Sequence, residues 1–345
     1  MDIKKIAVIG AGWRAMTWFN VINAMPNFLL DSIVVRNSEK AEMLKKQYPN
    51  TKILADVKQL GNVDHVLLCV NKASNLELAY ELVNRGVSVF CETPAGIAAD
   101  ISTDSDNLSY AENVNLQITE QYPLRPRIIA IEKLIEEGYF GDVHTVEISC
   151  CHSYHAVAVA RKILKTGDKM PKITKFVVDD EYYESDGRNG RKEPELKNHK
   201  RTIALLDFGY KRAIYDFSHG QYFSSIRGER ISVKGTKGEC INGSGYRLVN
   251  GSEIPFSVAP VFSGVDCGLH ALDLLQLTCD GKVLFENPFA GCRFSEEEIA
   301  MALWLKNASE KYQSGEPIYS LKQGATDVAI AAKLDGADGK INLGD

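Results

Sequence analysis

The stretch "KIAVIGAGWRA", residues 5–15, decides the fold of the first part of this chain. An apolar run ends at Gly10, and Gly10, Gly12 and Ala15 fit the spacing G-x-G-x-x-G/A between a strand and a helix. Small residues there allow a tight turn, a close approach of pyrophosphate and close helix–strand packing. A purely structural turn is the alternative, and the flanking strand and helix patterns favour dinucleotide binding. The predicted cofactor-binding residues of this loop are Gly10, Gly12, Trp13, Arg14 and Ala15.

Strand and helix patterns alternate over the first third of the chain. Apolar runs at 30–37, 63–71, 87–92 and 114–122 alternate with helical patterns at 14–25, 38–48 and 75–86, where Ser38 is a plausible N-cap. Such repeats predict a parallel sheet with right-handed crossovers. After Pro126, strand patterns separated by turn signals predict a mainly antiparallel sheet. We therefore expect an α/β Rossmann domain over residues 1–121, then an α+β domain over 122–345 with an open, mainly antiparallel sheet.

Bulk properties limit the function classes. The 345 residues suggest about two domains, with 45% apolar residues and a net charge of −5. No basic block or long apolar run is present, so we expect neither a nucleic-acid nor a membrane partner. The N-terminal apolar run is too short for a signal peptide, and the eight cysteines form no C-x-x-C pair. A cytoplasmic protein with reduced thiols is expected.

Two further segments bear on binding. An acidic residue about 20 positions after the glycines would bind the ribose of NAD. Arg36 occupies that region instead, with Lys40 nearby, which slightly favours NADP, although Arg36 can equally be a solvated loop cation. The charged stretch 179–201 is expected to be a solvated loop, with a mobile flap over a site as the alternative. Tyr182 and Tyr183 are expected to pack within that loop.

The order of several motifs resembles the Gfo/Idh/MocA oxidoreductase family. They are "AVIGAGWRA", "VDHVLLCVNKASNLELAYELVNRGVSVFCETPAG", "EQYPLRP", "IEEGYFGDV" and "ISVKGTKG", and they extend over most of the chain. The resemblance implies a Rossmann domain, a second domain with an open sheet, and hydride transfer between NAD(P) and sugars or polyols. It further implies that Asn71, Asn75 and Gln121 contact the cofactor or line the nicotinamide pocket.

The segment "ETP", residues 92–94, departs from the family's usual Glu-Lys-Pro. The resemblance implies that Glu92 contacts the cofactor ribose and that Pro94 shapes the turn, often through a cis bond. Thr93 replaces the lysine that normally assists proton transfer. A threonine hydroxyl can orient a substrate, but it is not a base near neutral pH.

A second group, "CHSYH" at 151–155, occupies the place of the family's D-x-G-x-H pattern, where His155 alone matches. His155 is the expected general base, with Tyr154 or His152 as the orienting donor. His152 can equally be an ordinary packed residue. Spacing of i, i+3 between the histidines could suit a metal, but without a carboxylate motif we expect none. The fragment 266–270 fits D-x-G-x-H literally, but it lies in the wrong order, so its His270 is interpreted as accidental.

The sequence therefore predicts an NAD(P)-dependent oxidoreductase that acts on a secondary alcohol or ketone of a sugar-like or polyol substrate. Two alternatives stay open: a redox-neutral hydrolase or lyase that recycles its NAD, and a dinucleotide- or sugar-binding sensor without catalysis. Because open sheets of such proteins often pair, the resemblance also implies a homo-oligomer, a dimer or a tetramer.

Overall fold

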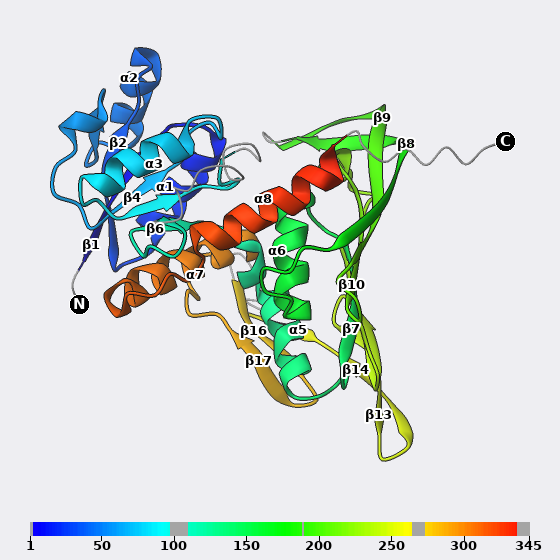
Figure 1. Ribbon diagram of the computed structural model, residues 1–345. Coiled ribbons are helices and arrows are strands. Elements are labelled where there is room, and N and C mark those ends of the chain that lie inside the picture. Colours follow the sequence, from blue (N-terminus) through cyan, green and yellow to red (C-terminus); the bar gives the residue numbers. More distant parts are fainter. Residues whose placement is uncertain (1–2, 97–109, 188–189, 264–272, 337–345) are drawn as a thin grey trace. The chain divides into compact units, whose positions relative to one another are not determined.

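A computed structural model describes residues 3–96, 110–187, 190–263 and 273–336 of the chain (Figure 1). The chain forms two compact units. The first comprises residues 1–125, 262–275 and 287–328, and the second comprises 126–261, 276–286 and 329–345. The N-terminal unit thus also includes two segments from the last third of the chain, which the sequence patterns had assigned to a second domain.

The first unit contains the predicted parallel sheet. Its six strands lie in the order β3-β2-β1-β4-β5-β6, and every pairing is parallel. The strands are β1 (Lys4–Ile9), β2 (Phe28–Val34), β3 (Lys52–Leu54), β4 (His65–Leu68), β5 (Val89–Cys91) and β6 (Leu116–Ile118). Strand β4 is buried along its whole length, as expected of a strand covered on both faces. The Rossmann fold class is therefore confirmed.

The helices of this unit follow the predicted periodicity. They are α1 (Trp13–Ala24), α2 (Ser38–Gln47), α3 (Asn75–Asn84) and α7 (Glu296–Lys311), with short 3-10 turns η1 (Val57–Gln59), η3 (Tyr122–Leu124) and η5 (Tyr312–Ser314). The expected N-cap of α2 was wrong by one residue. Asn37 has the extended backbone of a cap, and its side chain accepts a hydrogen bond from the Lys40 amide at 2.8 Å, whereas Ser38 is already helical.

The second unit is built on one large sheet of eight strands in the order β14-β13-β12-β11-β7-β10-β9-β8. The strands are β7 (Val143–Ser149), β8 (Lys172–Gly187), β9 (Gly190–Asp207), β10 (Arg212–Ser218), β11 (Arg230–Gly235), β12 (Gly238–Ile241), β13 (Ser244–Val249) and β14 (Ser252–Ser257). The β7–β10 pair is parallel and the other pairs are antiparallel. The prediction of a mainly antiparallel sheet is confirmed.

Helices α5 (Pro126–Glu136) and α6 (Ser153–Leu164) lie on one face of this sheet (Figure 1). The short turn η4 (His219–Phe223) packs against β8 and β9. The remaining elements are a three-stranded sheet of β15 (Ala259–Ser263), β16 (Asp273–Cys279) and β17 (Lys282–Glu286), and helix α8 (Leu321–Asp335).

The described parts of the charged stretch, 179–187 and 190–201, form strands, so the interpretation of this stretch as a loop was wrong. It belongs to the long antiparallel pair β8–β9, in which Asp179 lies opposite Lys200. These two side chains form an ion pair at 2.5 Å. Glu184 forms ion pairs with Lys192 and Lys197. Opposite charges on facing strands stabilise a pairing that the composition alone disfavours.

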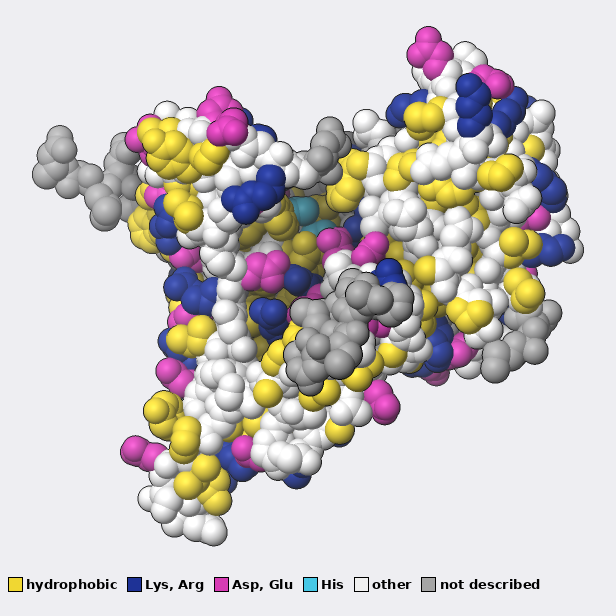
Figure 2. Space-filling model, turned by 180° about the vertical axis from the view of Figure 1, so that it is seen from behind, with side chains coloured by type: hydrophobic (Ala, Val, Ile, Leu, Met, Phe, Trp, Pro, Cys, Tyr) yellow, Lys and Arg dark blue, Asp and Glu magenta, His cyan; other side chains and the backbone are white. Residues whose placement is uncertain are grey.

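Charges are mixed over the surface that Figure 2 shows. On this face, basic and acidic side chains of the described residues are interspersed rather than gathered by sign. No helix within the described ranges is long and apolar enough to cross a membrane.

A buried histidine links β4 to helix α7 inside the first unit. The ring of His65 stacks on Phe90 at 4.5 Å, and its two nitrogens lie 2.9 Å from Ser88 Oγ and 3.1 Å from Ser309 Oγ. The side chain is 2% exposed, and burial lowers the pKa of His65 to about 4. The ring is therefore neutral in the folded protein at pH 7.

This histidine predicts acid sensitivity of the first unit. The unfolded chain takes up the proton near pH 6.5, before the folded chain does, so stability falls as the pH drops from about 6.5 toward 4. The contribution of His65 to this loss is up to about 3 kcal/mol. Chemical denaturation of the parent and of His65→Gln at pH 7 and pH 4 measures it. An equal loss of stability in both proteins would contradict the assignment.

Candidate functional site: the glycine loop and the Glu92 network

The two glycines of the first loop have different constraints. Gly10 has a φ of +115°, and a Cβ built there would lie 2.2 Å from the carbonyl oxygen of Cys69, so only glycine fits. Gly12 has extended backbone, and a Cβ there would meet no atom within 4 Å. Gly10 is thus required by the fold, whereas the fold leaves the space in front of Gly12 open.

Helix α1 begins directly after this space. Gly12 is its N-cap, no side chain caps the helix, and its first turn carries no acidic residue. Amide groups at the start of a helix and the helix dipole attract anions, phosphates above all. The open side of Gly12 therefore fits a pyrophosphate, as the sequence predicts.

A cavity of about 320 Å³ lies beside the loop within the first unit. Its lining is mostly apolar and combines the ends of β1 and β2 with the region of η1. The lining residues are Ile9, Gly10, Val34, Val35, Arg36, Ala55, Asp56, Val57, Val70 and Leu78. An apolar slot next to an anion-binding loop fits the adenosine half of a dinucleotide. Arg36 brings a cation to this cavity, and the Asp56 carboxylate caps η1 through the Lys58 amide at 2.8 Å.

Glu92 follows strand β5, and its carboxylate receives four hydrogen bonds. Its Oε1 accepts from Arg14 Nε at 2.9 Å and from Thr93 Oγ1 at 3.3 Å. Its Oε2 accepts from Trp18 Nε1 at 2.7 Å and from Thr119 Oγ1 at 2.7 Å. The carboxylate therefore ties the end of β5 to helix α1 and to the end of β6.

Arg14 extends this network to helix α7. Its Nη1 donates to Glu297 Oε1 at 2.7 Å, and its side chain is only 13% exposed. Burial alone would lower the pKa of the Arg14 guanidinium, but Glu92 and Glu297 raise it above its ordinary value. Nearby, burial raises the pKa of Glu120 well above its ordinary value.

The turn after Glu92 is held by Asn75. The amide nitrogen of Asn75 donates to the carbonyl oxygens of Glu92 at 3.3 Å and Pro94 at 2.9 Å, and its oxygen accepts from the Gly96 amide at 3.2 Å. The Thr93–Pro94 peptide bond is cis. Asn75 thus shapes the turn that carries Thr93. The other predicted asparagine, Asn71, makes a local contact: its side-chain oxygen accepts a hydrogen bond from the Ala73 amide at 3.0 Å.

Gln121 and Trp13 differ in exposure. Gln121 is fully buried; its Nε2 lies 3.4 Å from Glu297 Oε1, and its Oε1 has no hydrogen-bond partner among the described residues. A buried acceptor without a donor is costly, and a ligand amide could satisfy it.

Trp13, at the first position of α1, is 55% exposed. Ala15 is fully buried and allows α1 to pack closely.

The second unit brings together three of the four predicted catalytic residues, His152, Tyr154 and His155, at the start of α6, whereas Thr93 belongs to the first unit. The ring of His152 lies 4.6 Å from that of Tyr154 and 4.8 Å from that of His155, and the last two lie 4.4 Å apart. His155 is 5% exposed. The Tyr222 hydroxyl lies 2.8 Å from His152 Nδ1 and accepts from the His152 amide at 2.9 Å.

Sequence patterns did not identify two members of this cluster, Tyr222 and His219, or one member of the Glu92 network, Glu297. Tyr222 and His219 of η4 lie near His152, with ring centroids 5.8 and 6.4 Å away, and no motif marks them. Glu297 lies in the first turn of α7, where a helix-start carboxylate has an ordinary explanation. The fragment 266–270 with His270 lies outside the described residues. Among those described, no group of three or more His, Cys, Asp or Glu side chains could hold a metal ion.

Comparisons with known proteins agree with this reading. Residues 4–120 match the Gfo/Idh/MocA family model, described as an oxidoreductase family with an NAD-binding Rossmann fold. The rhizopine catabolism protein MocA of Rhizobium meliloti is 23% identical over 112 residues, which are 32% of this chain and 34% of that protein. The chain thus matches about a third of the length of this curated relative. The expected family resemblance is confirmed for the N-terminal domain.

Solved structures extend the likeness in fold to nearly the whole chain. Levoglucosan dehydrogenase, in complex with NADH and levoglucosan, has a TM-score of 0.68, with 11% identity and coverage of 97% of this chain and 96% of that one. An oxidoreductase from Agrobacterium radiobacter, in complex with NAD+, L-tartaric acid and magnesium, has a TM-score of 0.64, 16% identity and coverage of 95% and 94%. At these identities the likeness shows the two-domain fold alone.

The Glu92 network predicts a stability defect in Glu92→Gln. The carboxylate accepts hydrogen bonds from N–H and O–H donors, and the amide nitrogen of glutamine would face some of these donors without being able to accept from them. Arg14 would also lose a charged partner. We expect a loss of about 2–4 kcal/mol in the free energy of unfolding, measured by chemical denaturation. The control is Glu42→Gln, which removes the exposed pair with Lys45 and should leave stability unchanged. Equal stability of the two variants would contradict the anchoring role of Glu92.

Proposed function

We propose that this protein is an NAD(P)-dependent oxidoreductase that interconverts a secondary alcohol and a ketone in a sugar-like or polyol substrate. The observation that carries the proposal is the open space in front of Gly12 at the uncapped start of α1, beside an apolar cavity. The named neighbours, a dehydrogenase of the sugar levoglucosan and an oxidoreductase bound to a hydroxy acid, support this substrate class.

The chain supplies binding, orientation and a proton acceptor. The nicotinamide ring, when bound, supplies the hydride acceptor or donor. The amides after Gly12 hold the phosphates, the apolar cavity takes the adenosine, and the buried Oε1 of Gln121 accepts from an amide of the ligand. His155 accepts the proton of the substrate hydroxyl, with Tyr154 and His152 orienting the ring or the substrate.

Thr93 gives a redox-neutral reaction a specific basis as the second candidate. Its hydroxyl donates to Glu92 at 3.3 Å, and a threonine cannot take up a proton as the family's lysine does. Absorbance at the NADH wavelength reports the net change of the cofactor. Product formation without a change in this absorbance would favour a hydrolase or lyase over a dehydrogenase. A sensor would bind dinucleotide or sugar, with a thermal shift, and turn over nothing.

Cofactor choice and assembly remain part of the proposal. Arg36 lines the adenosine cavity, and the one carboxylate in its lining, Asp56, is engaged by the backbone of η1. This arrangement favours the 2′-phosphate of NADP slightly over the free ribose hydroxyls of NAD. We also propose a cytoplasmic homo-oligomer, a dimer or tetramer, on the basis of the family resemblance.

Gly12→Ala separates ligand binding from folding. A Cβ at this position meets no protein atom, so we expect an unchanged melting temperature. The added methyl group occupies the space where phosphate would approach, and dinucleotide affinity should fall at least about tenfold in calorimetric titration. Gly61→Ala, where a Cβ also meets nothing, is the matched control and should bind as the parent does. If Gly12→Ala binds dinucleotide as tightly as the parent does, the phosphates do not bind at this loop.

His155→Gln tests the proposed base. The parent is first screened for NAD(P)H absorbance change with inositols, hexoses and levoglucosan, and the variant is then assayed on the best of these. Loss of a general base should lower kcat at least about 100-fold, with dinucleotide affinity unchanged. His144→Gln, on strand β7, is the control and should keep its activity. Intact turnover in His155→Gln would show that the proton goes elsewhere, and a melting curve checks that the buried substitution folds.

A further inference from the structure

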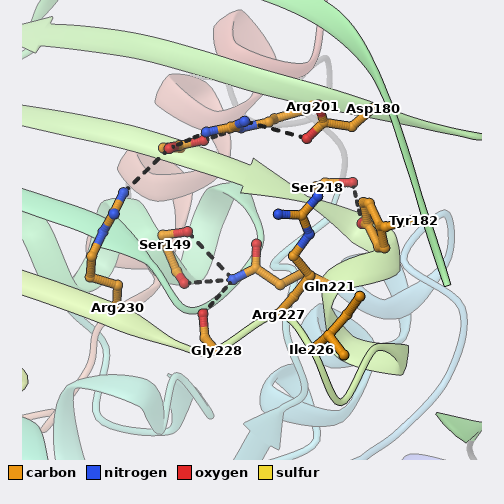
Figure 3. Close-up of a pocket in the computed structure, with 11 residues that line it drawn as sticks. Ser149, Asp180, Tyr182, Arg201, Ser218, Gln221, Ile226, Arg227, Gly228 and Arg230 are labelled. Carbon is orange, nitrogen blue, oxygen red and sulfur yellow. Dashed lines mark hydrogen bonds and ion pairs between the residues drawn. The ribbon is translucent and has the colours of Figure 1, made fainter. Parts of the chain in front are cut away.

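The second unit contains a polar pocket on the sheet face opposite to α5 and α6. It has a volume of about 270 Å³, and strands β7, β8, β9 and β10 form its floor while the loop after η4 forms its wall (Figure 3). The lining residues are Ser149, Asp180, Tyr182, Arg201, Asp216, Ser218, Gln221, Ile226, Arg227, Gly228 and Arg230. All belong to the second unit, so this pocket is separate from the cofactor cavity of the first.

The lining carries more positive than negative charge. Its three arginines face two aspartates, which leaves a surplus of one positive charge. Arg201 donates to both oxygens of Asp216, at 2.6 and 2.7 Å, and Arg230 lies 3.4 Å from the same carboxylate. Asp180 has a longer contact of 3.4 Å with Arg201. Because Asp216 is already saturated by arginines, the pocket offers a ligand donors rather than acceptors.

Arg227 is the donor without a carboxylate partner. In the ranges that the structure describes, its guanidinium forms no ion pair, and it stacks over the Tyr182 ring at 4.6 Å (Figure 3). Tyr182 is itself fixed, since its hydroxyl lies 2.7 Å from Ser218 Oγ and its side chain is 4% exposed. A stacked guanidinium keeps its in-plane N–H groups free for an oxyanion.

The wall of the pocket is held in place by Gln221. Its Nε2 donates to the carbonyl oxygens of Ser149 at 2.8 Å and Gly228 at 3.1 Å, and so connects the loop to strand β7 (Figure 3). The Arg227 amide also donates to the Ser224 carbonyl at 3.2 Å, which closes a turn. The backbone of the loop that carries Arg227 is therefore held by bonds within the unit, which reduces the ordering cost of binding.

We propose that this pocket binds the carboxylate or phosphate group of a small anionic molecule, with Arg227 as the main contact and Arg230 as the second. Guanidinium groups match both oxyanions through paired hydrogen bonds. The proposal does not depend on the proposed redox function, because no residue of the pocket belongs to the dinucleotide site.

Calorimetric titration of the full chain with inorganic phosphate and, separately, with citrate tests the site. Saturable binding of either anion is expected, and the two arms distinguish a phosphate from a carboxylate ligand. Arg227→Gln should weaken it at least about tenfold, as loss of a charge-assisted hydrogen-bond pair does. Arg212→Gln is the matched control, since Arg212 is an exposed arginine on the same strand and face as Asp216 but outside the pocket. It should bind as the parent does.

The glycine loop could also bind phosphate, so the titration is repeated in Gly12→Ala, where the signal that depends on Arg227 should persist. Absence of saturable binding of both anions to the parent would overturn the proposal, as would equal affinities of Arg227→Gln and the parent. An equal loss in Arg212→Gln would show general charge attraction and also overturn it. If neither anion binds and Arg227→Gln changes the mass measured by light scattering, the pocket is a contact between copies of the chain and the proposal fails.

Discussion

The first unit depends on one buried carboxylate that must be satisfied. Glu92 lies where strand β5 ends, and four donors from α1, β6 and its own turn converge on its two oxygens. Removing such a charge from water is unfavourable unless hydrogen bonds and an opposite charge replace the solvent. The network thereby fixes the glycine loop, because Arg14 and Trp18 belong to the helix that begins at this loop.

This constraint also changes how the motif "ETP" is understood. With both oxygens occupied, Glu92 serves as an anchor for the loop, and Thr93 adds a donor to it instead of a second charge. The network reaches helix α7 through Glu297, which comes from a distant part of the sequence. The proposed dinucleotide site would thus be supported by residues that need not touch the ligand.

Local patterns predicted the Rossmann sheet, its helices and the glycine loop, because hydrophobic periodicity and turn-forming residues can be recognised within a short stretch of sequence. The β8–β9 pair was missed, since its strands are stabilised by cross-strand ion pairs such as Asp179 with Lys200, which only the register reveals. Glu297 and Tyr222 were missed for a similar reason. Each acquires its role from a partner far away in the chain, Arg14 or His152, and no local motif marks that contact.

Calorimetric titration of the full chain with NAD+ and with NADP+ tests the proposed cofactor role of the first unit most directly. The proposal that a pyridine dinucleotide binds rests on the open backbone at Gly12, the uncapped helix start and the adjacent apolar cavity. We expect saturable binding of one dinucleotide per chain, somewhat tighter for NADP+ because Arg36 lines the cavity. If neither dinucleotide binds, the assignment of the first unit as a cofactor domain is contradicted.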